Sequence, residues 1–213
     1  MKANFNIKKA ASREPLNEDQ WSGHETDSQL WKRFKKGDES AFISLYKLNI
    51  HRLFKLGMKF TSDRNLVKDC LQDFFADLIQ KRQNLSDTDN IYLYLFVAFR
   101  RKILLYLRRK KKHTHEVLDE GSPFQVELGA EEKIINAQWD EYQVKKLNKA
   151  LADLDPKERE AIYYFYFNNM SYQEIAEVFN YHQVSSARRL LYRAIFKIRK
   201  HFLSPILVLL AIQ

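Results

Sequence analysis

The chain has few of the residues that punctuate β-rich folds. Its 213 residues include 5 glycines and 4 prolines. Folds with many short strands need these residues at their turns, because they supply the backbone angles that hairpins require. Leucine, lysine, glutamate, alanine and phenylalanine are abundant instead. The scarcity of glycine and proline therefore argues against an all-β protein and predicts an all-α fold.

Cysteine is also scarce. Cys70 is the one cysteine of the chain, so a disulfide within the chain is excluded. Val67, Leu71 and Phe74 surround it at helical spacing. We interpret Cys70 as a buried helix residue, with a reactive thiol as the alternative.

Long apolar segments are absent. The first 20 residues stay polar and contain no apolar core of signal-peptide length. The apolar run Ile206–Ile212 is much shorter than the ~20 residues of a membrane span. We therefore expect a cytoplasmic protein without stable membrane insertion, and we expect this run to contact the last helix or a partner.

Positive charge is in excess. The formal net charge is +9 and the pI about 9.4. The long-range field of such a chain attracts polyanions, either nucleic acid or an anionic membrane surface. Charge alone does not choose between them.

Apolar periodicity divides the chain into two small helical domains. The first contains four predicted helices, the last of which is apolar and aromatic over residues 91–107 and ends in the basic run at residues 108–112. The second contains a helix-turn-helix. The stretch between the domains has no sustained period and is predicted to be a flexible linker. The expected boundaries are 1–25 for a disordered N-terminal tail, 26–112 for the first domain, 113–130 for the linker, 131–203 for the second domain and 204–213 for an apolar tail.

Capping residues mark several expected helix boundaries. Gly37-Asp38 indicates a helix stop followed by a new N-cap, and Ser62 is expected to cap the next helix. Asp155-Pro156-Lys157-Glu158 and Ser171-Tyr172-Gln173-Glu174 each have the pattern of a capping box.

Residues 171–194 have the pattern of a helix-turn-helix. Ile175, Ala176 and Phe179 share one helical face, a polar turn follows, and a second helix begins at Val184. Paired helices are also a common packing unit, so the pattern alone leaves DNA binding open; the adjacent arginines and the net charge favour it. The residues that could reach bases and phosphates in a major groove are Gln183, Ser185, Ser186, Arg188, Arg189 and Arg193.

Three aspartates repeat at a spacing of four residues. Asp69, Asp73 and Asp77 place like charges along one helical stripe, which is unfavourable unless a basic surface faces it. A solvated polar face is the alternative. A metal-dependent nuclease would also use carboxylates, but no histidine or further acid lies nearby in the sequence to complete a metal site.

Aromatic and basic residues occur together over residues 91–112. We expect most of the rings to lie in the core. Bases of single-stranded DNA stack on exposed rings, typically with ~1–3 kcal/mol per base, while cations hold the backbone. The candidates for such contacts are Tyr92, Tyr94, Arg100, Arg101, Arg108 and Arg109.

Catalytic signatures are missing from the sequence. The 6 histidines show no metal-ligand spacing, and no nucleotide-binding loop or nucleophilic triad is visible. We predict a protein that is not an enzyme and has no cofactor, no metal site and no catalytic residues.

The C-terminal motifs resemble those of one family. Arg159-Glu160-Ala161, "SYQEIA" at residues 171–176 and Arg193-Ala194 resemble the promoter-binding domain of extracytoplasmic-function (ECF) sigma factors of the sigma-70 family. Asn180 stands where that family often has glycine. The "SAR…YRA" stretch resembles a variant frequent in the Bacteroidota.

The N-terminal half resembles the same family independently. "DCLQDFF" at residues 69–75 is similar to its "D-hydrophobic-hydrophobic-Q-E-x-F", and Tyr94-Leu95-Phe96 followed by Arg108-Arg109 is similar to its "W-L-Y…L-R-R". Leu105 stands where many members have aspartate. The resemblance covers roughly residues 27–203, with both halves in the family's order.

The resemblance implies a non-catalytic sigma factor. Its first domain would bind core RNA polymerase and melt the downstream promoter element, with residues 83–90 helping to capture a flipped base, and its second domain would recognise the upstream element. An anti-sigma factor is a further partner that the resemblance raises. The residues assigned to the clamp of the largest polymerase subunit are Asp69, Gln72, Asp73 and Phe75.

Two other functions stay open. A stand-alone helix-turn-helix regulator would bind duplex DNA without polymerase. A nucleic-acid enzyme that uses the aspartates would need a divalent metal.

Overall fold

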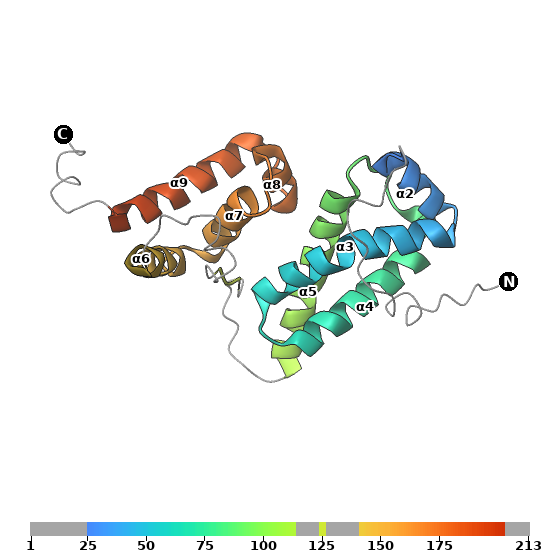
Figure 1. Cartoon of the computed structure of the whole chain (residues 1–213), viewed down its shortest axis with the longest axis horizontal. Helices are drawn as coiled ribbons and strands as arrows, with labels where there is room; N and C mark the ends of the chain where they lie inside the picture. Colours follow the sequence, from blue (N-terminus) through green and yellow to red (C-terminus); the bar gives the residue numbers. More distant parts are fainter. Residues whose placement is uncertain (1–24, 114–123, 127–140, 203–213) are drawn as a thin grey trace. The chain divides into compact units, whose positions relative to one another are not determined.

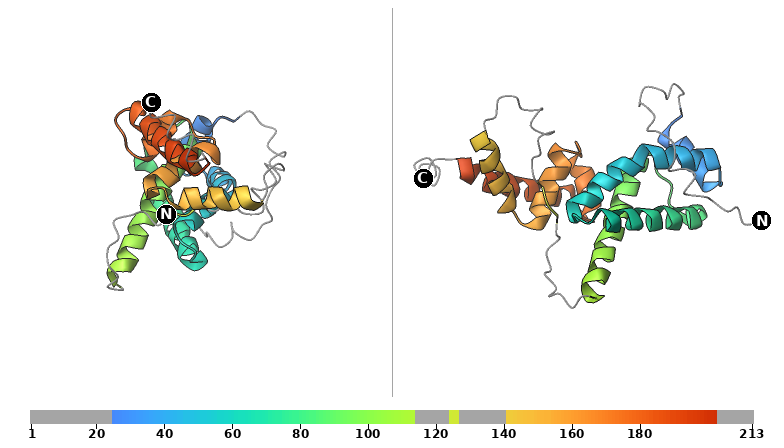
Figure 2. Two further views of the ribbon diagram at one scale, coloured as in Figure 1. Left: turned by 90° about the vertical axis from the view of Figure 1, so that its left-hand side faces the viewer. Right: turned by 60° about the horizontal axis from the view of Figure 1, so that its bottom comes forward.

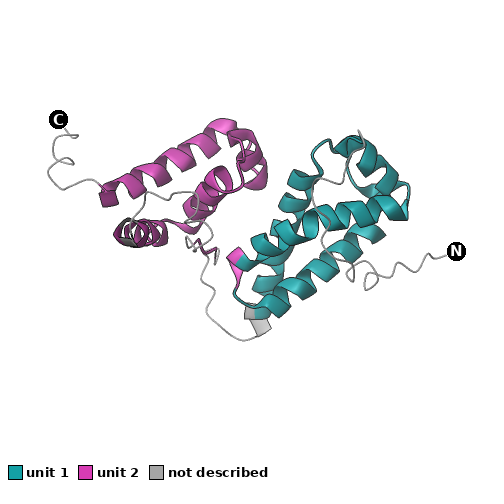
Figure 3. Cartoon of the chain, in the orientation of Figure 1, with its two compact units in different colours: residues 1–58, 62–115 teal, residues 59–61, 116–213 magenta. Residues whose placement is uncertain are grey.

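The computed structural model describes residues 25–113, 124–126 and 141–202. Within these ranges the chain is helical and contains no strand, which confirms the predicted all-α fold. Contacts divide the chain into two compact units (Figure 3). Unit 1 comprises residues 1–58 and 62–115, and unit 2 comprises residues 59–61 and 116–213.

Unit 1 contains the four helices predicted for the first domain. They are α2 (Asp27–Lys35), α3 (Glu39–Phe60), α4 (Arg64–Gln80) and α5 (Ile91–His113), with a short 3-10 helix, η2 (Arg82–Asn84), after α4. In Figures 1 and 2, α3 and α4 lie side by side and α5 crosses them. The last helix includes the basic run at residues 108–112, with which it was predicted to end, and one further residue.

The turn between α2 and α3 follows the predicted stop and cap. Gly37 has a φ of 93°, a left-handed conformation that glycine adopts without strain. The Asp38 carboxylate accepts hydrogen bonds from the backbone N–H groups of Ser40 (2.9 Å) and Ala41 (3.2 Å). Hydrogen bonds from the Ser40 and Arg33 side chains lower the pKa of Asp38 to about 2.

The cap of α4 differs from the prediction by one residue. Asp63, and not Ser62, is the N-cap, because its carboxylate accepts hydrogen bonds from the backbone N–H groups of Asn65 (3.1 Å) and Leu66 (3.0 Å). Serine and aspartate are equally good caps, so the residue type alone does not choose between neighbours.

The core of unit 1 is rich in aromatic rings. A glycine brings two of its helices together: a Cβ on Gly57 of α3 would lie 2.5 Å from a methyl carbon of Val67 on α4. The large side chains fully buried in unit 1 include Trp31, Phe34, Phe42, Phe75, Phe96 and Phe99.

Cys70 is buried in α4, as predicted. Burial raises the pKa of its thiol to about 12, above the ordinary value of 9.0. Because the thiolate is the reactive form, we expect a chromogenic thiol reagent to modify Cys70 on the order of a thousandfold more slowly in the native chain than in denaturant. Cys70 is the one cysteine in the sequence, so the absorbance reports it alone. Equal rates in both states would contradict its burial.

Unit 2 contains α6 (Glu141–Ala152), α7 (Pro156–Tyr166), α8 (Tyr172–Val178) and α9 (Val184–Phe202). The longest, α9, packs against each of the other three (Figure 1). Its contacts use a face of small and aliphatic side chains, namely Ala187, Leu190, Leu191 and Ala194. Both predicted capping boxes are present, at Asp155 and Ser171.

An ion-pair cluster connects α9 to the first turn of α7. The Lys197 ammonium lies 2.8 Å from the Asp155 carboxylate and 2.7 Å from the Glu158 carboxylate. The Glu158 side chain is only 4% exposed, and a buried carboxylate is costly unless it is paired. The hydrogen bonds that Lys197 donates to both carboxylates raise its pKa, and its ammonium lowers the pKa of Asp155.

Part of the predicted linker is attached to unit 2. Phe124 is fully buried, with its ring centroid 5.5 Å from that of Tyr163 and 5.7 Å from that of Tyr164. The Arg159 guanidinium donates to the backbone oxygens of Phe124 (2.9 Å) and Leu151 (2.8 Å). Residues 124–126 are therefore a packed segment. Residue 113 of the predicted linker belongs to α5, and residue 25 of the predicted N-terminal tail pairs with Arg33. The rest of the predicted linker, of both predicted tails and of the predicted helical residues before 141 lies outside the described residues.

Candidate nucleic-acid interface

Helices α8 and α9 form the predicted helix-turn-helix. Ile175 and Ala176 are buried as predicted, whereas Val178 takes the buried position expected of Phe179, which is half-buried. Asn180, in the turn, has a φ of 55°. Asparagine and glycine are the residues that adopt this left-handed conformation most readily, which explains how asparagine replaces the family's common glycine.

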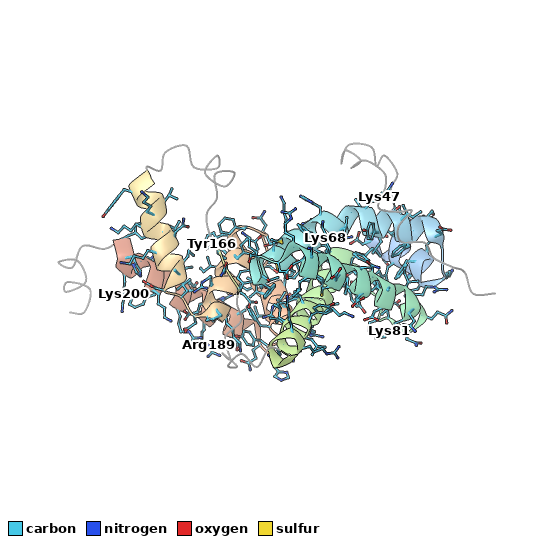
Figure 4. The ribbon with its side chains drawn as sticks, turned by 90° about the horizontal axis from the view of Figure 1, so that it is seen from below. Lys47, Lys68, Lys81, Tyr166, Arg189 and Lys200 are labelled. Carbon is cyan, nitrogen blue, oxygen red and sulfur yellow. The ribbon has the colours of Figure 1, made fainter. Side chains whose placement is uncertain are left out.

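The candidate DNA-binding residues lie together at the start of α9. They alternate with the buried residues Ala187 and Leu190, so they share the outward face of the helix. Arg189 and, further along α9, Lys200 can be followed in Figure 4. Ser186 is half-buried, and the exposed candidates are Gln183, Ser185, Arg188, Arg189 and Arg193.

Short-range contacts hold several of these side chains. Ser185 donates a hydrogen bond to the Gln183 side chain (3.2 Å), and Arg189 donates one to the Ser186 hydroxyl (3.4 Å). The Arg188 guanidinium lies over the ring of Tyr172, 5.3 Å from its centroid. Sequence reasoning did not identify Tyr172 as part of this interface, because the two residues are on different helices.

The aspartate stripe of α4 is divided in the structure. Asp77 forms an ion pair with Lys102 of α5, and this hydrogen bond lowers the pKa of Asp77. Asp69 and Asp73 are exposed and form no ion pair with any residue that the structure describes. Lys102, from the same unit, therefore balances the charge of Asp77. The carboxylates of Asp69 and Asp73 are accessible to a partner.

One residue predicted for polymerase binding lies elsewhere. Gln72 is exposed beside Asp69 and Asp73, but Phe75 is fully buried. Its ring centroid lies 4.8 Å from that of Tyr46 and 5.3 Å from that of Phe74. Phe75 is a core residue, so its assignment to a docking surface was wrong: the motif match placed it on the correct helix but gave no information on which face is buried.

The aromatic and basic residues of α5 fall on two sides of the helix. Tyr92 has its ring 5.6 Å from that of Phe96 and 3.6 Å from the Arg52 guanidinium, whereas the ring of Tyr94 lies 4.8 Å from that of the buried Trp31. With about 3.6 residues per turn, Tyr94, Arg101 and Arg108 share another face, since they are seven residues apart. Arg101, Arg108 and Arg109 are exposed, whereas Tyr92, Tyr94 and Arg100 are half-buried. The structure therefore does not place all six on one surface.

Helix α2 contacts the loop that precedes α5. The Trp31 indole N–H donates to the Ser86 carbonyl oxygen (2.9 Å), and the Lys35 ammonium pairs with Asp87 (2.6 Å). The backbone N–H of Ile91, the first residue of α5, donates to the Asp27 carboxylate (2.7 Å). These contacts join segments more than fifty residues apart in the sequence, so no local pattern could have predicted them. They fix the loop against α2.

No metal centre accompanies these surfaces in the described part of the chain. Residues 25–113, 124–126 and 141–202 contain no cluster of histidine, cysteine, aspartate and glutamate side chains that could hold a metal ion. In the same ranges, no helix combines the length and the hydropathy that crossing a bilayer requires.

Comparison with protein families gives one match. Residues 145–197, which cover α7, α8 and most of α9, match the family Sigma-70, region 4. A search of curated proteins finds no significant relative.

Solved structures with a similar fold cover most of the chain. The sigma factor RpoE, in complex with the anti-sigma factor NepR from Bartonella quintana, aligns with a TM-score of 0.52 and 17% identity over 76% of this chain and 96% of its own. CnrH, in complex with the cytosolic domain of CnrY, aligns with a TM-score of 0.56 and 19% identity over 83% of this chain and 96% of its own.

The fold, the candidate site and the family match indicate the same class of protein. The chain is basic, its described secondary structure is helical, and arginines lie on the outward face of α9, a combination that is typical of DNA-binding proteins. Residues 145–197 of its C-terminal unit match Sigma-70, region 4, and the fold of the described residues is similar to those of RpoE and CnrH.

Proposed function

We propose that this chain binds core RNA polymerase and directs it to promoters, with catalysis left to the polymerase. The match of residues 145–197 to Sigma-70, region 4 carries this proposal. The outward arginines of α9 support it, since a recognition helix reads base edges from its exposed face. A cytoplasmic location follows from the proposal, because the polymerase and the promoter are there. The Bacteroidota variant remains a prediction.

Each unit has its own proposed task. The start of α9 would enter the major groove of the upstream element. In unit 1, Asp69, Gln72 and Asp73 would contact a basic surface of the polymerase clamp, and the loop over residues 83–90 would receive a flipped base. The contacts of Trp31 and Lys35 with this loop support that role, because a binding loop held in place loses less conformational freedom when it binds.

The exposed arginines of α5 give this proposal a test on DNA melting. We expect the Arg101→Ala, Arg108→Ala double variant to open promoters less, with a closed complex that still forms. Both side chains are exposed on one face, and each cation that binds a single strand contributes about 0.7 to the salt-dependence slope, so the slope for opening should fall by about 1.4. Permanganate footprinting at several salt concentrations measures this. Lys68→Ala, which removes one exposed cation from α4, is the control, and equal opening by double variant and wild type would contradict the assignment.

An anti-sigma factor is a proposed further partner. RpoE is seen with the anti-sigma factor NepR, and CnrH with the cytosolic domain of CnrY. The likeness in fold supports a protein of the same kind as a regulator of this chain.

A pull-down with core polymerase followed by run-off transcription tests the whole proposal. We expect the chain to be retained by core enzyme and to produce a defined transcript that core enzyme alone does not produce. Binding to duplex DNA without retention by the polymerase would favour the stand-alone regulator. Cleavage of nucleic acid that depends on a divalent metal would favour the enzyme.

A further inference from the structure

The two adjacent arginines of α9 have different surroundings. Arg189 uses one of its N–H donors on the Ser186 hydroxyl, at 3.4 Å. Arg188 makes no hydrogen bond or ion pair with any residue that the structure describes. Its guanidinium makes a cation–π contact with Tyr172, with the guanidinium carbon 5.3 Å from the ring centroid. All the hydrogen-bond donors of Arg188 are therefore available to a ligand.

Tyr172 is itself held in place. It is the first residue of α8, directly after the N-cap Ser171, whose backbone N–H donates to the Glu174 carboxylate at 2.8 Å. The Tyr172 ring also lies 5.2 Å from the ring of Phe165, at the end of α7. The capping box fixes the backbone and Phe165 limits the ring, so Tyr172 presents a defined platform to Arg188.

Stacking and hydrogen bonding use different parts of a guanidinium. A ring attracts the flat face of the group, whereas the five N–H donors point outward from its edge. An arginine held over a ring can therefore still make two parallel hydrogen bonds to O6 and N7 of guanine. It also loses less rotamer freedom on binding than a free side chain does.

We infer that Tyr172 is a positioning residue that holds Arg188 over its ring for the recognition of a guanine in the upstream element, and that Arg188, rather than Arg189, reads this base. The inference rests on the proposed function. The contact between Tyr172 of α8 and Arg188 of α9 would hold an exposed arginine in the position from which it reads a base.

Holoenzyme assembled from the full-length chain tests the inference on promoters randomised in the upstream element, with bound DNA sequenced. We expect Arg188→Ala to remove a guanine preference at one position and Arg189→Ala to keep it. Tyr172→Leu should reduce the same preference about two- to fivefold, the size of an exposed cation–π contact, while Tyr172→Phe should keep it. In the Arg188→Ala background, Tyr172→Leu should have no further effect. Tyr142→Leu, which removes an exposed ring of unit 2 with its own cation–π contact to Lys146, is the matched control.

Other outcomes overturn the inference in distinguishable ways. Tyr172 would have a purely structural role if Tyr172→Leu weakened the binding of all sequences equally. The same would follow if Tyr172→Leu changed binding further in the Arg188→Ala background. If Tyr172→Phe weakened all sequences equally, the hydroxyl would contact phosphate. Loss of the guanine preference in Arg189→Ala would assign the base to the other arginine. Wild-type holoenzyme without any upstream preference would instead contradict the proposed function itself.

Discussion

An Asp69→Lys, Asp73→Lys double variant is expected to lose most of its affinity for core RNA polymerase. Both carboxylates are exposed and neither pairs with a described residue, so reversing their charge places two ammonium groups against the proposed basic surface. Like charges brought together at an interface cost several kcal/mol, so the affinity should fall about a hundredfold or more. Titration of labelled chain with core enzyme at low and high salt measures the loss.

The fold should tolerate this change. The two aspartates already repel each other at a spacing of four residues, and two lysines repel each other to a similar extent. We therefore expect thermal unfolding of the double variant to match that of the wild type. Glu39→Lys, which reverses one exposed carboxylate at the start of α3, is the control for a general charge effect. A folded double variant with unchanged affinity would remove Asp69 and Asp73 from the docking surface.

Replacing Phe75 by alanine is expected to destabilise unit 1 and not to act on polymerase binding directly. Phe75 is fully buried among rings, and truncation of such a side chain leaves a cavity, which typically costs about 3–5 kcal/mol of unfolding free energy. Urea unfolding followed by Trp31 fluorescence, with Trp21 and Trp139 replaced by phenylalanine, measures the loss in unit 1.

Gln72→Ala on the same helix provides the comparison. Gln72 is exposed, and surface substitutions usually change stability by less than about 0.5 kcal/mol. If Phe75→Ala left stability unchanged and abolished binding to core enzyme, the original assignment of Phe75 to the docking surface would be restored.

Local signals in the sequence predicted the helices and most of their ends. Asp38, Asp155 and Ser171 cap helices as expected, because a cap depends on residues within four positions of each other. The error at Ser62 has the same origin, since two neighbouring residues were both suitable caps.

Contacts between distant segments were beyond such reasoning. Periodicity identified the aspartate stripe but not that Lys102, on another helix, pairs with Asp77. The sequence around Phe124 has no apolar periodicity, so it did not predict that the Phe124 ring is buried or that Arg159 donates a hydrogen bond to its carbonyl oxygen. The roles of Asp69, Asp73 and the α9 arginines are still predictions, although the structure shows that these side chains are accessible.

The cluster around Lys197 determines how acid and base would affect the placement of the recognition helix. The pKa of Asp155 is lowered, so the stability that it contributes is present above its unfolded pKa and is lost as the pH falls through the folded one. The pKa of Lys197 is raised, so its contribution is present below its unfolded pKa and is lost as the pH rises through the folded one. Both losses fall outside the range of intracellular pH. A cell that acidifies or alkalinises by one unit would therefore leave the ion pair between Lys197 of α9 and Asp155 at the start of α7 charged on both sides.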